Sequence, residues 1–310
     1  MVKTKAKSSG GGAAETAAAD IQKLREAVVE RSDLLLTDLS LPALGLPEQS
    51  VRSRLQDRGK RWDRSVPAGS KLADLKSILR NKSTSKRFAV ARGCRVPEVY
   101  WFGNATEPPD FANFPPNFVL KPNHSHSSQG VVVYKNGTNL MDGSRVSLAD
   151  LPGLMASVAP SIGLRADAEW LVEELIADID PRYAIPRDFK FHVAGGRAHF
   201  LYVVNRNAVR DHWCTCWYTR SWSRINDRMG YGRLFGPDME KPVGFDALLS
   251  AVDRLALALG IFMRIDFYLT ANGPVLGEFT PFADHGLYYS EMCELALSQM
   301  WGLFPDPEGV

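Results

Sequence analysis

Residues 118–134 read FVLKPNHSHSSQGVVVY, and this stretch decides how the chain folds. An apolar run leads into Lys121, a loop of small and polar residues follows, and a second apolar run begins at Val131, so the pattern predicts a β-hairpin. Lysine supplies a positive charge, and successive backbone N–H groups of such a loop form a concave site for anions. The hairpin therefore suits a triphosphate. An ordinary polar hairpin loop is the alternative.

A second hairpin is predicted near the other end, where residues 263–281 read MRIDFYLTANGPVLGEFTP. The Asn272-Gly273 step between two apolar runs is a strong hairpin signal. Asp266 lies on the first strand and Glu278 on its partner, so their carboxylates can converge on one hard cation, and Thr280 shares their face. We predict a magnesium site here, with a solvated acidic pair as the alternative.

Together the two hairpins resemble the ATP-grasp superfamily, most closely the D-alanine:D-alanine ligases and the polysaccharide-biosynthesis (teichuronopeptide-type) ATP-grasp proteins. Arg264-Ile265-Asp266 matches the R-I-D of the ligases, and Glu278-Phe279-Thr280 matches their E-x-N with threonine in place of asparagine. Their loop pattern K-P-x-x-x-G-S-S-x-G is matched by Lys121, Pro122, Ser127, Ser128 and Gly130, with His126 where the first glycine stands. The resemblance implies an α+β ATP-grasp fold, in which two α+β lobes clamp ATP, and Mg²⁺ as the metal.

The same resemblance assigns residues that contact the nucleotide. Lys86 opens a predicted helical stretch that runs toward the Val96-Pro97 step, and the resemblance places a lysine at the start of such a helix, where it is implied to contact the α-phosphate. The alternative is an ordinary surface lysine, one of several that include Lys82. The ribose is implied to be held by Asp180, with Asp178 as its rival. The loop residues implied to contact phosphate are Lys121, His126, Ser127 and Ser128, and those implied to line adenine are Glu173, Glu174, Leu175 and Ile176.

A strand with strict alternation is predicted at residues 187–193, returning over residues 198–204 after Gly195-Gly196. Alternation places Asp188, Lys190 and His192 on one face, which is unusual unless that face lines a polar cleft. The resemblance assigns Lys190 to the β- or γ-phosphate, and we add Arg206 as a second cation. We interpret His192 as a structural histidine rather than a catalytic one.

Composition and charge limit the class of protein. The chain has 310 residues, 45% of them hydrophobic and 23% charged, with a net charge of +2, which is typical of a globular protein. No apolar run reaches transmembrane length and the first residues lack the apolar core of a secretory signal, so we expect a cytoplasmic protein without a membrane partner. The cysteines lack paired metal-ligand spacing, so reduced thiols are expected.

The predicted organisation has four parts. Residues 1–19 form a disordered tail, 20–85 a helical N-terminal region, 86–176 a lid subdomain with the phosphate-binding hairpin, and 177–310 a catalytic subdomain. Within the second part we predict one helix that begins at Asp20 and two more around Val51–Leu55 and Leu72–Leu79. The basic stretch Arg58–Arg64 separates the last two. Later helices are predicted at Leu151–Val158, Phe245–Leu259 and Glu291–Trp301.

Residues 207–236 contain three tryptophans, two tyrosines and five arginines. Aromatic and guanidinium groups can stack on and clamp an anionic or planar compound, so we predict a loop that binds the acceptor substrate. Binding of single-stranded nucleic acid is the alternative, but the chain lacks the basic excess that nucleic-acid binding usually requires. We therefore expect no nucleic-acid partner.

The chemistry implied is an ATP-dependent, ADP-forming ligase that activates a carboxylate as an acyl phosphate and couples it to an amine. Lys86, Lys121 and Lys190 would offset charge on the transferring group. Arg264 would stabilise the oxyanion, or merely pair with Asp266 or Glu278. An ATP-grasp kinase acting on a hydroxyl of a small molecule or sugar and a non-catalytic nucleotide-binding protein are the alternatives. The predicted partners are small carboxylate and amine substrates, and the resemblance leaves a homodimer open.

Overall fold

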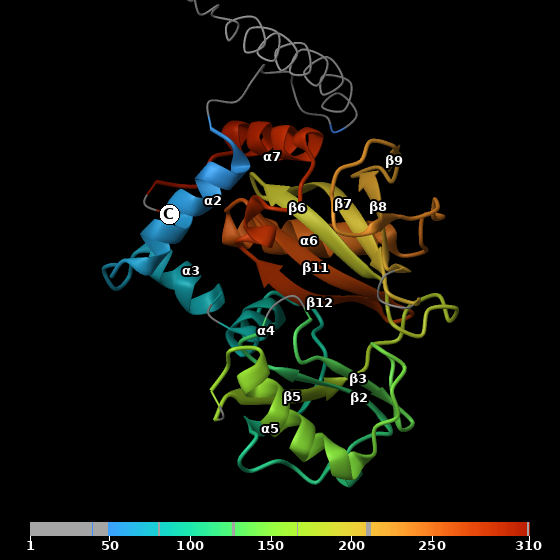
Figure 1. Cartoon of the computed structure of the whole chain (residues 1–310). Helices are drawn as coiled ribbons and strands as arrows, with labels where there is room; N and C mark the ends of the chain where they lie inside the picture. Colours follow the sequence, from blue (N-terminus) through green and yellow to red (C-terminus); the bar gives the residue numbers. More distant parts are fainter. Residues whose placement is uncertain are drawn as a thin grey trace, which may run out of the picture.

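The computed structural model describes residues 39, 49–79, 81–125, 128–165, 167–208, 212–308 and 310, without the side chain of Asp284. The chain builds two β-sheets that lie one above the other, the larger sheet in the upper part of Figure 1 and the smaller sheet in the lower part. The predicted tail at residues 1–19 and the helix predicted from Asp20 lie outside the described residues.

The small sheet carries the first predicted hairpin. Its strand order is β1-β5-β2-β3-β4, with every neighbouring pair antiparallel. Helix α5 (Leu151–Ser161) covers one face, and its Met155 packs with Phe118 and Trp170 in a core of its own. The hairpin predicted around Lys121 is therefore confirmed. The strands are β1 (Val99–Asn104), β2 (Asn117–Pro122), β3 (Val132–Lys135), β4 (Thr138–Asn139) and β5 (Glu169–Glu174).

The large sheet carries the second hairpin. Its order is β10-β8-β7-β6-β11-β12, with β9 beside β8, and only the β10–β8 pair of the described strands is parallel. The predicted turn is confirmed, since Gly273 has φ 98°, which favours glycine. The strands are β6 (Asp188–Ala194), β7 (Arg197–Asn205), β8 (Cys214–Thr219), β9 (Arg224–Ile225), β10 (Leu234–Phe235), β11 (Met263–Thr270) and β12 (Gly273–Thr280).

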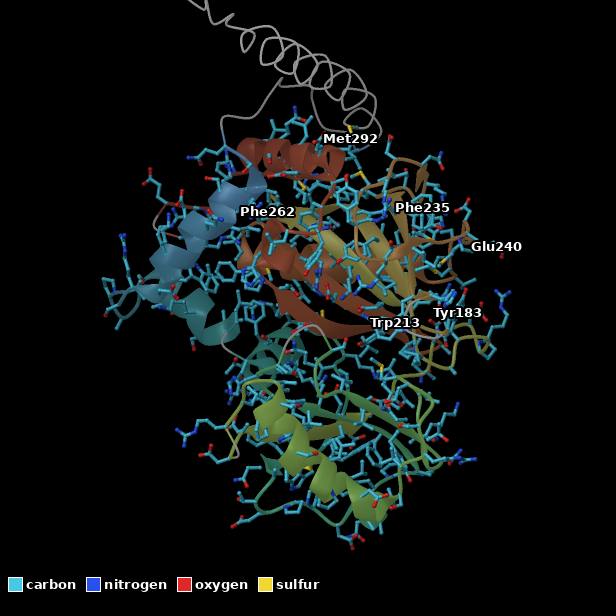
Figure 2. All side chains as sticks on the ribbon, in the orientation of Figure 1. Tyr183, Trp213, Phe235, Glu240, Phe262 and Met292 are labelled. Atoms are coloured by element: carbon cyan, nitrogen blue, oxygen red, sulfur yellow. The ribbon has the colours of Figure 1, made fainter. Side chains whose placement is uncertain are left out.

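Helices cover both faces of the large sheet. Leu248, Val252, Leu255 and Leu259 recur at helical spacing and bury one side of α6 (Phe245–Leu259) in the same core as Phe191. The other face packs against α7 (Glu291–Leu303) in a core that includes Phe262 and Met292, which Figure 2 labels near the top of the molecule. The helices predicted at 245–259 and 291–301 are confirmed.

The first described N-terminal helix differs from the prediction. Helix α2 (Val51–Asp63) runs through most of the predicted basic stretch, so that stretch does not separate two helices. Arg58 is fully buried there because its guanidinium donates to the Phe262 and Pro281 carbonyls and pairs with Asp306. Helix α3 (Lys71–Leu79) is as predicted, and short 3-10 helices occur at η1 (Phe111–Asn113), η2 (Leu148–Asp150) and η4 (Ala283–Gly286).

Helix α4 (Lys82–Val90) begins four residues before Lys86, where the sequence analysis placed the helix start. The Asn81 side chain caps it by accepting from Thr84 N at 3.0 Å, and Thr84 Oγ1 accepts in return from Asn81 N at 3.3 Å. This reciprocal capping box fixes the first turn. Lys86 therefore lies in the middle of the helix.

Candidate active site

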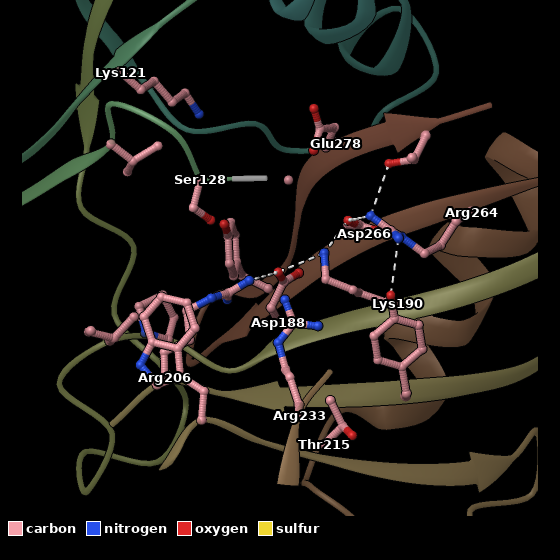
Figure 3. A pocket seen from close by; sticks show the side chains of 18 of the residues that line it. Lys121, Ser128, Asp188, Lys190, Arg206, Thr215, Arg233, Arg264, Asp266 and Glu278 are labelled. Carbon is pink, nitrogen blue, oxygen red and sulfur yellow. Dashed lines mark hydrogen bonds and ion pairs between the residues drawn. The ribbon is translucent and has the colours of Figure 1, made fainter. Parts of the chain in front are cut away.

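A cavity of about 770 Å³ lies between the two sheets. The small sheet contributes β2 and β5, the large sheet contributes β6, β11 and β12, and the segments at 230–233 and 288–289 close one side. Figure 3 shows side chains from both sheets pointing into this space, with Lys121 on one wall and Asp188 and Arg233 on the other. Most of the predicted site residues meet here.

On the large sheet, Lys190 lies between two buried carboxylates. Its Nζ is 2.8 Å from Asp188 and forms an ion pair with Asp266. Arg206 binds Asp188 from the other side at 3.1 Å. Burial alone would raise the pKa of Asp188, but the charges of Lys190 and Arg206 outweigh burial and lower that pKa to about 2. We call Asp188, Lys190, Arg206, Arg264 and Asp266 the large-sheet cluster.

Strand register explains how this cluster is assembled. Asp266 is directly opposite Lys190 across β11–β6 and opposite Glu278 across β11–β12. Because side chains alternate between faces, the predicted shared face of Asp188, Lys190 and His192 is confirmed. Strand pairing therefore assembles the cluster except for Arg206, which directly follows β7.

Arg264 contacts protein groups on several sides. Its Nε and one terminal nitrogen donate to Asp266 at 2.7 and 3.0 Å, and its other terminal nitrogen donates to the Tyr202 hydroxyl at 3.0 Å. The terminal nitrogen that donates to Asp266 also donates to Thr280 Oγ1 at 3.3 Å. Of the two alternatives predicted for Arg264, pairing with Asp266 is therefore the one present in this structure.

The predicted metal ligands lie side by side on neighbouring strands. Among the described residues, no three His, Cys, Asp or Glu side chains are grouped so that they could hold a metal ion. Asp266 and Glu278 with the Thr280 hydroxyl are a hard oxygen set that fits Mg²⁺ if phosphate oxygens complete the shell. Glu278 suits this role because its side chain is 43% exposed and faces the cavity. Asp266 would have to exchange its contact with Lys190 for the ion.

The small sheet has the opposite arrangement of charges. Glu173 is buried, with a side chain only 5% exposed, and its two oxygens pair with Lys86 and Lys121. Burial would raise the pKa of Glu173, but the two lysines outweigh burial and lower it. Burial also lowers the pKa of Lys86. We call Lys86, Lys121 and Glu173 the small-sheet cluster.

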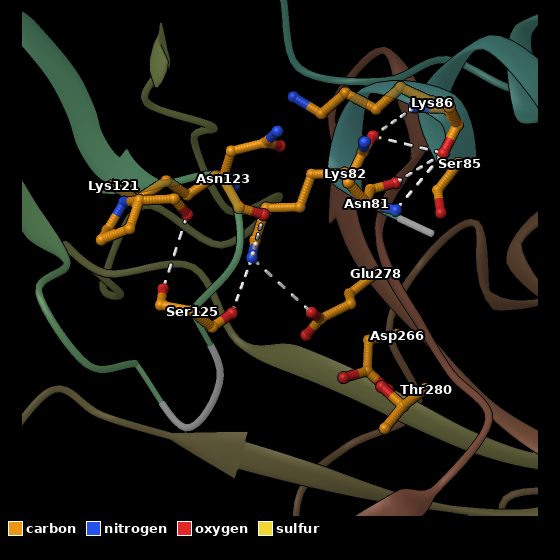
Figure 4. Close-up of polar contacts among 12 residues, drawn as sticks. Asn81, Lys82, Ser85, Lys86, Lys121, Asn123, Ser125, Asp266, Glu278 and Thr280 are labelled. Carbon is orange, nitrogen blue, oxygen red and sulfur yellow. Dashed lines mark hydrogen bonds and ion pairs between the residues drawn. The ribbon is translucent and has the colours of Figure 1, made fainter. Parts of the chain in front are cut away.

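Lys82 is a site residue that the sequence analysis passed over. Its Nζ donates to the Ser125 carbonyl at 2.8 Å and the Asn123 carbonyl at 3.3 Å, and it lies 4.0 Å from Glu278 Oε1 (Figure 4). It thus joins the loop after β2 to a predicted metal ligand. The signal that could have found it is the capping pair Asn81 and Thr84, which marks Lys82 as the first helical residue.

The segment after β5 follows the prediction for adenine more closely than for ribose. Glu173, Glu174, Leu175 and Ile176 all line the cavity. Asp180 instead pairs with Arg182 at 2.6 Å, and these hydrogen bonds lower its pKa to about 2. Its rival Asp178 is buried against Arg187 at 2.8 Å. Neither aspartate is among the described residues that line the cavity.

The predicted phosphate loop is described in part. His126 and Ser127 lie outside the described residues, whereas Ser128 lines the cavity with a left-handed backbone, φ 58°. Gly130 has φ 72°, and a Cβ atom there would lie 3.0 Å from Pro122 and from Val158. Only glycine fits this position, which matches the glycine of the resembled pattern.

The aromatic segment at 207–236 divides between core and cavity. Tyr218 stacks on Trp222 at 4.2 Å in the core beside α6, so these two rings are not available to a substrate. Trp213, Trp217, Tyr231 and Arg233 line the cavity, and Figure 2 labels Trp213 where the two sheets approach each other. The predicted substrate loop is thus corrected to its cavity-facing half, because residues on β8 alternate between the two faces.

His192 is fully buried and does not line the cavity. Its ring stacks on Trp217 at 6.0 Å and meets Phe200 at 4.9 Å. Burial, with the nearby charges of Arg264 and Lys190, lowers its pKa well below 6.5. Neither ring nitrogen has a hydrogen-bond partner within the part of the chain that the structure describes. A neutral, structural histidine fits these observations.

All four cysteines lie within the described residues. Cys94, Cys214, Cys216 and Cys293 are all free. None of the helices in the described ranges combines the length and apolarity needed to cross a membrane.

Comparison with known proteins supplies a family match. A family model described as TupA-like ATPgrasp matches residues 71–299, which is most of the chain. A search of curated proteins found no match.

Several solved structures also match the chain. The D-alanine-D-alanine ligase from Helicobacter pylori is 17% identical over 72% of this chain and 61% of its own length, with a TM-score of 0.43. The D-Ala:D-Ser ligase from Enterococcus faecalis is 16% identical over 75% and 61%, with a TM-score of 0.45. The L-amino acid ligase from Bacillus licheniformis is 14% identical over 83% and 53%, with a TM-score of 0.39. The chain thus spans less than two thirds of each of these three proteins.

Proposed function

The chain belongs to the TupA-like ATP-grasp family, which confirms the predicted α+β ATP-grasp fold, and from this premise we propose that it is an ATP-dependent, ADP-forming carboxylate–amine ligase. The observation that carries the proposal is the register pairing of Asp266 with both Lys190 and Glu278 on one wall of a cavity whose other wall holds Lys121 and Glu173. A metal–phosphate site then faces a basic site across one space.

The nucleotide would lie between the two sheets. Glu174, Leu175 and Ile176 line the cavity, and their main-chain N–H and C=O groups would form hydrogen bonds with adenine. Lys121, with its ammonium group beside Glu173, would turn toward phosphate, and Ser128 with its neighbouring amides would bind phosphate oxygens. The predicted ribose contact of Asp180 requires Asp180 to leave Arg182.

Asp266 and Glu278 would hold Mg²⁺, with Thr280 as a weaker oxygen donor. The ion would offset charge on the transferring phosphoryl group when bound. Lys190 would then move its contact from Asp266 to a phosphate oxygen, while Asp188, itself held by Arg206, keeps the lysine in place.

Transfer of phosphate to a hydroxyl is a second candidate function, and one observation favours it. Arg264 is bound by Asp266, Tyr202 and Thr280, so an oxyanion would have to replace one of these partners. A kinase needs the lysines and carboxylates but no oxyanion arginine.

The test is ADP formation by the purified full chain with ATP and Mg²⁺, against a panel of carboxylates, amines and alcohols. A carboxylate–amine pair that yields ADP and an amide, with Arg264→Ala lowering turnover by about 100-fold, supports the ligase. ADP with a phosphorylated alcohol and an unaffected Arg264→Ala variant would support the kinase instead. ATP bound without ADP formation would refute both and leave a nucleotide-binding protein.

A further inference from the structure

One side of the cavity holds groups that the proposed nucleotide site does not use. Residues 230–233 and 288–289 form this side, and they are joined through the main chain because Tyr231 N donates to the Tyr288 carbonyl at 2.8 Å. Figure 3 shows the Arg233 side chain pointing into the cavity toward Asp188, on the side opposite Lys121.

Arg233 differs from its neighbours because no described residue is its partner. Arg220 pairs with Asp253 at 2.6 Å, and Arg224 donates to the Gly236 carbonyl at 2.6 Å. Arg206 is occupied by Asp188. Among the described residues, Arg233 has neither a hydrogen bond nor an ion pair, although its side chain faces the cavity. A guanidinium group held this way suits bidentate binding of an incoming carboxylate.

Tyr231 and Tyr288, which are joined by the main-chain hydrogen bond, line the same side of the cavity, and the Arg228 guanidinium lies 5.0 Å from the centre of the Tyr231 ring. Tyr231 is 52% exposed and Tyr288 is 58% exposed, yet both line the cavity. By contrast, Tyr218 and Trp222 of the same aromatic segment are stacked against each other beside the core. Exposed aromatic rings on a fixed main chain offer an apolar surface on which another ring can pack.

We propose that this side of the cavity binds the second substrate, and that this substrate is a ring compound carrying a carboxylate. Arg233 binds the carboxylate, while Tyr231 and Tyr288 contact the ring. That this compound is a substrate rests on the proposed function, but its binding requires neither ATP nor turnover. A small acyclic amino acid would leave the two tyrosines without a contact.

The test is ligand-observed NMR titration of the full chain without ATP. The probes are benzoate and cyclohexanecarboxylate, which separate an aromatic from a saturated ring, with acetate lacking the ring and benzamide lacking the charge. Both ring carboxylates should bind at least about tenfold more tightly than acetate or benzamide. Arg233→Gln should weaken them about tenfold, and Tyr288→Ala about threefold. Arg197→Gln, at the exposed first residue of β7 and outside the cavity lining, is the matched control and should change nothing.

Equal binding of all four probes, or unchanged ring-carboxylate binding in Arg233→Gln, would overturn the proposal. ATP affinity of the same variants gives a second readout. A loss of ATP affinity in Arg233→Gln with unchanged benzoate binding would assign Arg233 to phosphate instead. Ring-carboxylate binding that depends on Arg233 in a protein that forms no ADP would keep this subsite and reject the proposed function. ADP formation without such binding would do the reverse.

Discussion

The two walls of the cavity hold opposite arrangements of the same groups. On the large sheet one lysine, Lys190, lies between two carboxylates, whereas on the small sheet one carboxylate, Glu173, lies between two lysines. The large sheet brings the carboxylates of Asp266 and Glu278 to the cavity, which suits a metal ion, whereas the lysines of the small-sheet cluster outnumber its one carboxylate, which suits phosphate. Because ATP with magnesium carries both charges, the contrast itself indicates how the ligand would be oriented.

We predict that removing one lysine lowers the free energy of unfolding more in the large-sheet cluster than in the small-sheet cluster. Lys190→Met leaves two buried aspartates that keep only their arginine partners, so the free energy of unfolding should fall by about 3 kcal/mol. Lys86→Met leaves Glu173 paired with Lys121, so the loss should be nearer about 1 kcal/mol. Urea denaturation measures both.

The control for this pair is Lys60→Met. Lys60 is 69% exposed in its contact with Asp57, so the midpoint of unfolding should not change. Equal losses for Lys190→Met and Lys86→Met would contradict the contrast between the clusters.

The next largest effect is expected at the metal site. Glu278→Gln removes one of two carboxylates from the predicted magnesium set, so ADP formation should fall by about 100-fold or more, since even outer-shell changes cost about 10–100-fold. The fold should persist because this side chain is partly exposed. Glu107→Gln, an exposed glutamate away from the cavity, should keep full activity. Wild-type activity in Glu278→Gln would remove the metal assignment.

On the basic wall, Lys121→Met should weaken ATP binding about tenfold, because a charge-assisted hydrogen bond to phosphate is lost. Calorimetry of ATP binding provides the measurement. The control is Lys135→Met at the exposed end of β3, which removes the same single positive charge as Lys121→Met. If both variants bind ATP with equal affinity, Lys121 does not contact phosphate.

The smallest effect is expected for Lys82→Met. Lys82 donates to two loop carbonyls, and among the described residues its ion pair is with Glu278. Its loss should therefore lower ATP affinity only about threefold. Susceptibility of the loop to proteolysis should rise at the same time, because its anchor is lost. An unchanged digestion rate would show that Lys82 does not restrain the loop.

The same contrast explains what could be predicted from sequence. The large-sheet cluster was predictable in part, because strand alternation places Asp188 and Lys190 on one face and the Asn272-Gly273 turn brings Asp266 and Glu278 onto adjoining strands. The pairing of Asp266 with Lys190 joins strands far apart in the chain and was not predicted. The small-sheet cluster was predicted in its members but not in its contacts, since Lys86 reaches Glu173 from α4, a helix that packs against β12 of the large sheet. No local pattern encodes that approach.

Other differences have equally specific causes. Trp222 and Trp217 look alike in sequence, but the strand at Cys214–Thr219 had not been predicted, so their opposite surroundings could not be assigned. Arg58 looked like part of an exposed basic stretch, although carbonyl groups far along the chain hold it in the core. The domain boundaries and the homodimer remain predictions.

The most direct test of the account is calorimetric titration of ATP into wild-type protein and Glu278→Gln, each with and without Mg²⁺. The account predicts that Mg²⁺ raises the ATP affinity of the wild type by about tenfold or more, and that Glu278→Gln loses this increase while keeping its affinity without the metal. An equal response to Mg²⁺ in both proteins would show that the paired strands β11 and β12 do not hold the ion, and would contradict the proposed roles of the two walls.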